Sequence, residues 1–200
     1  MKKIVIIMLA LIIGIWMLFF RGGDNRPDGP KQAPLENHVN SSAINKSVDT
    51  MVAAYTLMKN AFVEADTTQI KAHAAAFITT VDSLRLADLQ KDTLIYTTAQ
   101  SKAEEMKSNA QGILGERDIT EMRKGFSMVS ESLYPFLKTL NYRGPKLYWQ
   151  NCPMAFGEDK AASWISNTAT ILNPYMGKQH PQYKATMLHC GTIEDSIISK

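Results

Sequence analysis

The sequence predicts an all-α fold: an up-down four-helix bundle over residues 42–140, an irregular C-terminal cap over residues 141–200 and an N-terminal membrane segment. Between residues 42 and 140, apolar side chains recur every three or four positions, which is the period of a helix with one buried face. The breaks between the periodic stretches are short, which favours antiparallel neighbours. After Leu140 the period stops, and Gly and Pro become frequent.

The N-terminal segment is an uncharged apolar run over residues 4–20, with two lysines before it and Arg21 after it. A helix of this length spans about 25 Å, slightly less than a hydrocarbon core of roughly 30 Å. No small-residue cleavage site follows, so for residues 1–21 we expect a signal anchor in preference to a cleaved signal peptide. The lysines place the N-terminus in the cytoplasm. The rest of the chain is then expected in the periplasm, tethered to the inner membrane through residues 4–20.

Residues 22–41 combine Gly and Pro with polar neighbours, a composition that buries too little apolar surface to order itself. We therefore predict a flexible linker. The helical period begins at Ser42, and Asp66 and Asp118 stand where the side chain of a helix N-cap is needed. The expected helices cover about residues 42–65, 66–84, 92–112 and 118–140. In the cap, which forms one domain with the bundle, short extended pieces such as residues 146–149 are the most regular structure expected.

Charge and motif content exclude several functions. The chain has 22 basic and 19 acidic residues, a net charge of +3, and no block of five or six like charges, so nucleic acid is not an expected partner. The helices carry no Glu-x-x-His pair, which argues against a di-iron site in the bundle. The absence of a Cys-x-x-Cys pair argues against a thiol–disulfide enzyme. We expect a binding protein and not an enzyme.

The cap contains both cysteines of the chain, and each has a methionine nearby: Cys152 with Met154, and Cys190 with Met187. Thiolate and thioether groups are soft donors that match Cu(I) and related ions, whereas hard cations prefer carboxylates. The spacing of Met187 and Cys190 places them on one side of a helical or type I turn. His189 can replace a methionine or support a thiolate. These five residues are the candidate metal ligands.

A structural disulfide between Cys152 and Cys190 is the alternative. Exported proteins with two cysteines commonly pair them, and a bridge across about forty residues stabilises the fold by on the order of 3 to 4 kcal/mol. In that case the cap is a structural or partner-docking module of the cell envelope that binds no metal. Composition and spacing leave both interpretations open.

Four motifs of the cap carry a resemblance to a known family. They are Tyr-x-x-x-Cys-Pro-Met-Ala, Trp-Ile-Ser, Ile-Leu-Asn-Pro-Tyr-Met-Gly and Met-Leu-His-Cys-Gly, at residues 148–155, 164–166, 171–177 and 187–191. Together they resemble a bacterial family of exported proteins known only as a domain of unknown function. The same module is appended to periplasmic adaptor proteins of resistance-nodulation-division systems that export copper and silver. The resemblance covers about residues 45–195 and includes Arg123, Phe126 and Ser130.

The resemblance implies heavy-metal handling, and it marks Cys152, Met154, Met187 and Cys190 as the motif positions. From it we expect a carrier or buffer of Cu(I) or Ag(I) that acts beside a metal efflux or delivery component of the envelope. The chain departs from the family pattern at residues 178–186, which are an insertion between the Asn-Pro-Tyr and Met-Leu-x-Cys motifs. A site made by both halves requires that this insertion does not separate them.

Overall fold

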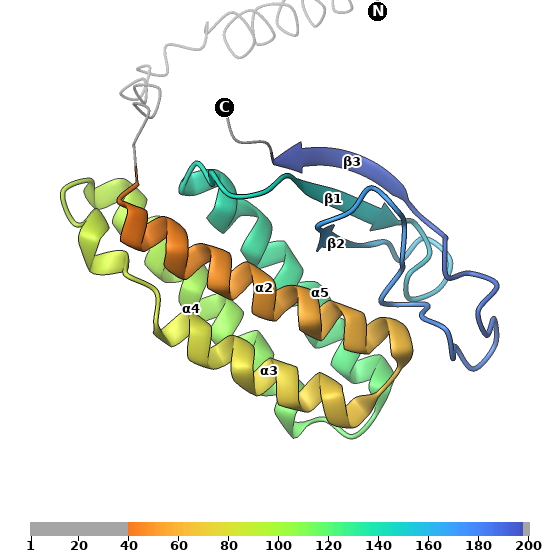
Figure 1. Ribbon diagram of the computed structural model, residues 1–200. Coiled ribbons are helices and arrows are strands. Elements are labelled where there is room, and N and C mark those ends of the chain that lie inside the picture. The colour runs from red at the N-terminus through yellow and green to blue at the C-terminus, as the bar shows by residue number, and fades with distance from the viewer. Residues whose placement is uncertain (1–39, 198–200) are drawn as a thin grey trace, which may run out of the picture. The chain divides into compact units, whose positions relative to one another are not determined.

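The computed structural model describes residues 40–197, in which four helices form a bundle and three strands form a small sheet (Figure 1). The expected membrane segment, residues 1–21, lies outside the described residues, and so does nearly all of the linker. Within residues 40–197, no helix combines the length and the hydropathy needed to cross a membrane.

The four predicted helices are confirmed, with bounds close to those expected. They are α2 (Ser42–Glu64), α3 (Thr67–Asp82), α4 (Thr93–Gly115) and α5 (Ile119–Thr139), and a short 3-10 helix, η1 (Leu86–Leu89), joins α3 to α4. The residue before each α-helix is Ser41, Asp66, Asp92 or Asp118, and its side chain accepts hydrogen bonds from first-turn amides. These caps satisfy donors that have no partner inside the helix, which explains where the helices begin.

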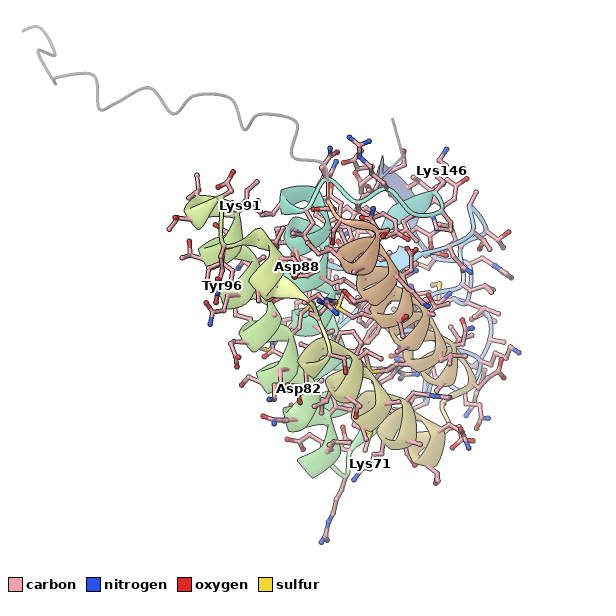
Figure 2. The ribbon with its side chains drawn as sticks, turned by 60° about the vertical axis from the view of Figure 1, so that its left-hand side comes forward. Lys71, Asp82, Asp88, Lys91, Tyr96 and Lys146 are labelled. Carbon is pink, nitrogen blue, oxygen red and sulfur yellow. The ribbon has the colours of Figure 1, made fainter. Side chains whose placement is uncertain are left out.

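The bundle core is built from the predicted apolar faces of all four helices. Aromatic rings fill its centre: the Tyr55 and Phe126 rings stack at 5.2 Å between centroids, and Phe62 lies 4.8 Å from Phe126. All three side chains are fully buried. On the surface of the bundle, the side chains of Lys71 and Asp82 project from α3 and that of Asp88 projects from η1 (Figure 2).

The cap is only partly irregular: it contains a small sheet, so the all-α prediction is wrong for this part of the chain. It contains an antiparallel sheet of β1 (Leu147–Cys152), β2 (Ala162–Ser166) and β3 (Thr192–Ile197), in the order β2-β1-β3. The strands have five or six residues each. β2 is buried along its whole length, whereas most of β3 is exposed. Neither strand therefore shows the apolar–polar alternation by which a half-buried strand is recognised.

The sheet packs beside α2 and α5, while α3 and α4 lie on the far side of the bundle (Figure 1). A buried hydroxyl joins the layers: Tyr55 Oη accepts a hydrogen bond from the Ile165 amide of β2 at 3.1 Å and pairs with Ser130 Oγ of α5 at 2.7 Å. At the outer strand, the Asp195 carboxylate accepts from Lys138 Nζ of α5 at 2.8 Å. The sheet is thus fixed to the bundle through polar contacts as well as packing.

Candidate functional site

The two cysteines lie together, although 38 positions separate them in the chain, and their Sγ atoms are 3.0 Å apart. Cys152 is the last residue of β1 and is buried, whereas Cys190 is partly exposed just before β3. Strands β1 and β3 are hydrogen-bonded neighbours, with Asn151 opposite Thr192. This register brings the end of one strand to the start of the other, and with them the two thiols.

Cys190 lies at the end of a tight turn. Its amide donates to the Met187 carbonyl at 3.0 Å, which confirms the predicted turn over the Met-Leu-His-Cys motif. The next residue, Gly191, has a φ of 141°. A Cβ there would lie 2.7 Å from the Asn151 carbonyl oxygen and 3.0 Å from the Trp164 ring. Only glycine lets the turn approach β1 this closely, so Gly191 is needed for the contact between the sulfur atoms.

Asn173 connects the Asn-Pro-Tyr segment to the turn that carries Cys190. Its Nδ2 donates to the Cys190 carbonyl at 2.8 Å, and its own amide donates to the Leu188 carbonyl at 2.9 Å. Its Oδ1 accepts from the amides of Tyr175 and Met176 at 2.8 and 3.1 Å. Asn173 is fully buried, so these bonds have no water to replace them. The segment therefore positions Cys190 against Cys152.

The Asn-Pro-Tyr segment is in turn held at the end of the bundle where α2 finishes and α5 begins (Figure 1). The buried Arg123 of α5 donates from Nε to the Pro174 carbonyl at 3.1 Å and from Nη2 to the Met176 carbonyl at 3.4 Å. Gly177, with a φ of 61°, approaches the end of α2 so closely that a Cβ would lie 2.9 Å from the Val63 carbonyl oxygen. The bundle thus serves as the frame that aligns the two sulfur motifs.

This frame gives a structural role to residues that periodicity alone did not distinguish. Arg123 anchors the loop, the Phe126 ring packs 5.9 Å from that of Tyr175, and Ser130 holds the Tyr55 hydroxyl. The resemblance pointed to all three, but helical spacing presents them as ordinary positions of a buried face. The only sequence signal of a tertiary role among these three residues was the charge of Arg123.

The other expected ligands, Met154, Met187 and His189, differ in their exposure to solvent. Met187 is half-buried. Met154, also half-buried, lines a small cavity with Arg123 and His180. His189 is exposed, and its Nδ1 donates to the Ile171 carbonyl at 2.8 Å, so in the neutral ring Nε2 is the nitrogen with a lone pair for a metal. Within residues 40–197, no group of three or more His, Cys, Asp or Glu side chains is arranged to hold a metal ion.

The insertion over residues 178–186 does not separate the two motifs. It folds on itself, with the His180 ring stacked on Tyr183 at 5.0 Å between centroids and the Lys184 amide bonded to the His180 carbonyl at 2.9 Å. At its start, Lys178 pairs with Glu64 at the end of α2, at 2.6 Å. The inserted residues thus form a side loop. After this loop the chain comes back to the end of β1, where Cys190 lies beside Cys152.

Burial, the hydrogen bond to Cys152 and the charge of that residue when ionised together raise the pKa of the Cys190 thiol to about 11. At pH 9 a thiol with this pKa is about one per cent ionised, against roughly half for a thiol with an ordinary pKa of 9.0. We therefore expect alkylation of Cys190 at pH 9 to be on the order of 50-fold slower in the folded protein than in urea, because the thiolate is the reacting form. Peptide mass spectrometry across pH 7 to about 11 measures this rate. Equal rates in folded and unfolded protein would contradict the raised pKa.

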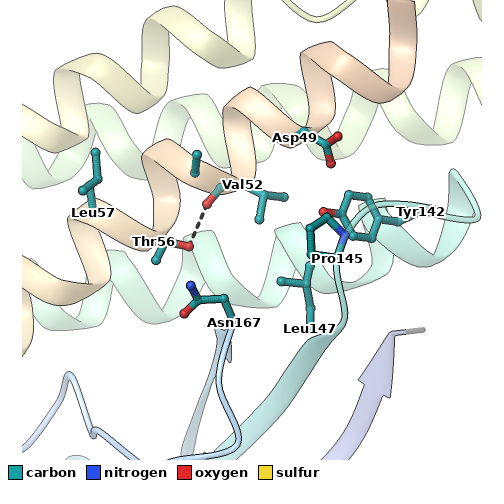
Figure 3. A pocket seen from close by; sticks show the side chains of 9 residues that line it. Asp49, Val52, Thr56, Leu57, Tyr142, Pro145, Leu147 and Asn167 are labelled. Carbon is teal, nitrogen blue, oxygen red and sulfur yellow. Dashed lines mark hydrogen bonds between the residues drawn. The ribbon is translucent and has the colours of Figure 1, made fainter. Parts of the chain in front are cut away.

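A separate open groove lies between α2 and the entry to β1 and contains neither cysteine (Figure 3). Its volume is about 480 Å³, and its walls are mainly apolar, from Val52 and Leu57 on α2 to Pro145 and Leu147 beside the sheet. The Thr56 hydroxyl at its side is already bonded to the Val52 carbonyl at 2.9 Å. The polar side chains of its lining are those of Asp49, Thr56, Tyr142 and Asn167, and no His or Cys is among the lining residues.

Comparison with known proteins finds a similarity to a family of unknown function. Residues 51–143 match the family described as "Protein of unknown function (DUF3347)". No curated protein and no solved structure matched the chain. The match supports the expected resemblance to a family of unknown function, and it covers most of the bundle. Cys152, Cys190 and the other sulfur-motif residues lie beyond its C-terminal limit.

Proposed function

We propose that this protein binds Cu(I) or Ag(I) between the thiolates of Cys152 and Cys190 and acts as a carrier or buffer in heavy-metal handling. The observation that supports the proposal most directly is the 3.0 Å approach of the two Sγ atoms. Two thiolates held side by side are a soft donor pair, which favours monovalent d10 ions over hard cations. Their partial burial keeps the bound ion away from bulk water, and Cys190 gives it a route of entry.

The geometry also bears on coordination number. Structural zinc sites use four ligands, whereas Cu(I) and Ag(I) accept two soft donors. With metal–sulfur bonds of about 2.3 Å, two opposed thiolates lie up to about 4.6 Å apart, so the sulfur atoms must separate from 3.0 Å by up to roughly 1.6 Å. Cys190 is the residue that moves, since it lies in a turn while Cys152 is held in β1. Met154, Met187 or Nε2 of His189 supplies any third ligand.

The cellular setting is part of the same proposal and rests on the sequence and the resemblance. We place the domain in the periplasm, tethered to the inner membrane through residues 4–20, with a metal efflux or delivery component of the envelope as its partner. A tethered carrier needs a site that is accessible from one side. The partly exposed Cys190 and the exposed His189 make the proposed site accessible from solvent.

The same contact between sulfur atoms supports a second candidate, a disulfide-stapled docking module without metal. A disulfide has an S–S length of about 2.03 to 2.05 Å, so the thiols need to approach by about 1 Å to form one. The bond would close β1 onto the turn before β3 and stabilise the cap by on the order of 3 to 4 kcal/mol. In this function the apolar groove beside α2 would be the docking surface for an envelope protein.

A Cu(I) titration of reduced protein, residues 38–200, against a chromophoric chelator without oxygen tests the proposal. We expect about one equivalent of Cu(I) to bind with release of about two protons near neutral pH, because both thiols must ionise. Since the pKa of Cys190 is raised, the apparent affinity is expected to increase with pH. Failure to bind Cu(I), together with rapid formation of the Cys152–Cys190 bond in air, would contradict metal binding and support the stapled module.

A further inference from the structure

A small cavity of about 190 Å³ is lined in part by Met154, the last residue of the Cys-Pro-Met motif. It lies between the first turn of α5 and the loop that follows Tyr175. Its walls include Thr120, Arg123, Met154, Phe156, His180 and Tyr183. Of these residues, the proposed metal site uses only Met154, as an optional third ligand.

Arg123 is the charged residue of this cavity, and it is only 3% exposed. A guanidinium carries five N–H donors, and Arg123 uses two of them, from Nε and Nη2 to loop carbonyls. The buried polar side-chain atoms without a partner in residues 40–197 are Asn40 Oδ1, Gln150 Oε1 and Trp164 Nε1. Nη1 of Arg123 donates no hydrogen bond to residues 40–197 and yet is not among these buried atoms, so it is not fully buried. It therefore keeps access to solvent through the cavity.

The charge of Arg123 is not paired. Among residues 40–197, no carboxylate lies within ion-pair distance of its guanidinium. Burial lowers its pKa to about 10, and the charge of Asp118 partly opposes this shift. Burying a cation without a counter-ion is unfavourable, so an anion that enters the cavity and pairs with it is favoured.

His180 adds a second donor to the cavity wall. Its Nδ1 accepts hydrogen bonds from the amides of Gln182 and Tyr183, each at 3.2 Å, so the proton of the neutral ring is on Nε2. Burial, followed by the charges of Arg123 and Lys184, lowers the pKa of His180, which keeps the ring neutral at pH 7. The rest of the wall is mixed: Thr120 and Gln182 are polar, while Met154, Phe156 and the ring of Tyr183 supply apolar surface.

We infer that this cavity binds a small organic monocarboxylate, with its carboxylate on the guanidinium of Arg123 and on Nε2 of His180. A planar carboxylate matches the fork of donors that a guanidinium presents. The apolar body of the ligand then contacts Met154, Phe156 and Tyr183. One anionic charge suits the site better than two, since the nearby Asp118 carboxylate offsets part of the charge of Arg123. The site shares only Met154 with the proposed metal site, and carboxylate binding does not require a bound metal.

Isothermal titration calorimetry of the full-length protein with benzoate, acetate and inorganic phosphate tests the inference. Benzoate is expected to bind one-to-one with a Kd of about 1 mM or tighter, acetate more weakly and phosphate weakest. Arg123→Lys, which keeps the charge but loses the fork, is expected to weaken benzoate binding about tenfold or more. Because Arg123 also anchors the loop, folding of this variant is checked by circular dichroism.

A second variant does not disturb that anchor. In His180→Asn, the Asn side chain can still accept from the amides two and three residues on, while the Nε2 donor is lost, so we expect about three- to tenfold weaker binding. The control is Lys160→Ala, which removes an exposed cation whose backbone bonds to that of Phe156 but which does not line the cavity; the benzoate affinity of this variant is expected to be unchanged. Absence of saturable benzoate binding up to about 10 mM, phosphate binding as tight as benzoate, or wild-type affinity in folded His180→Asn would overturn the inference.

Discussion

The Cys152→Ser/Cys190→Ser variant is expected to lose tight Cu(I) uptake altogether. A serine hydroxyl has nearly the volume of the thiol, but it is a hard donor and does not ionise at neutral pH, so it cannot replace a thiolate on a soft ion. The apparent affinity should fall by more than about 100-fold, the loss that removal of even an outer-shell partner of a metal site can reach. Competition against a chromophoric Cu(I) chelator, with both proteins reduced, measures the difference.

Single variants show whether the two sulfur atoms act as a pair. The Cu(I) affinities of Cys152→Ser and Cys190→Ser should each fall nearly to that of the double variant, because two-coordinate binding needs both thiolates. Met154→Leu and Met187→Leu, which keep side-chain volume, serve as matched controls and should each weaken binding by about tenfold at most if they supply an optional third ligand. Cu(I) binding by the double serine variant with wild-type affinity would exclude the cysteine pair as the site.

The Asn173→Ala variant is expected to lose about 2 to 4 kcal/mol of unfolding free energy, because buried groups lose their hydrogen-bond partners without access to water. The amides of Tyr175 and Met176 and the Cys190 carbonyl each lose the side chain that satisfies them. We also expect slower formation of the Cys152–Cys190 disulfide in air, since the turn that carries Cys190 is released. Urea denaturation and thiol titration over time measure the two effects.

Two further variants isolate the contribution of Asn173. Asn167→Ala changes an exposed asparagine of a nearby loop and should alter the unfolding free energy by less than about 0.5 kcal/mol. Asn173→Asp keeps the acceptor for the Tyr175 and Met176 amides but removes the donor to the Cys190 carbonyl. Its loss of unfolding free energy should therefore fall between those of Asn173→Ala and Asn167→Ala. If Asn173→Ala were as stable as Asn167→Ala, the buried segment would not be what holds Cys190 in place.

The helices were predictable from the sequence because the interactions that define them are local. The buried face of α5 repeats every three or four residues, and Asp118 accepts from the amides of Thr120 and Glu121 at its start. Asp66 caps α3 in the same way. An N-cap and its helix lie within a few positions of one another, so a single stretch of sequence contains both.

The sheet was not predictable in the same way. β3 contains Thr, Glu, Asp and Ser and is mostly exposed, so its strand conformation comes from pairing with β1 across about forty positions of chain. Trp149 of β1 stacks on Tyr134 of α5 at 4.4 Å between centroids, a contact with no counterpart in either local sequence. A short strand is stabilised by its neighbours more than by its own composition, which explains why the cap had no regular signal.

The sequence by itself determined the four helices and the N-caps of two of them, and it identified two cysteine motifs whose soft donors suggest a monovalent metal. Only the tertiary structure decided that the two motifs meet, through the β1–β3 register, the close approach of Gly191 and the hydrogen bond from Asn173 to the Cys190 carbonyl. It also decided that Arg123 is buried beside a cavity instead of exposed to water. The reason is physical: helix formation depends on neighbours three and four residues away, whereas a site between strands depends on contacts that exist only once the chain has folded.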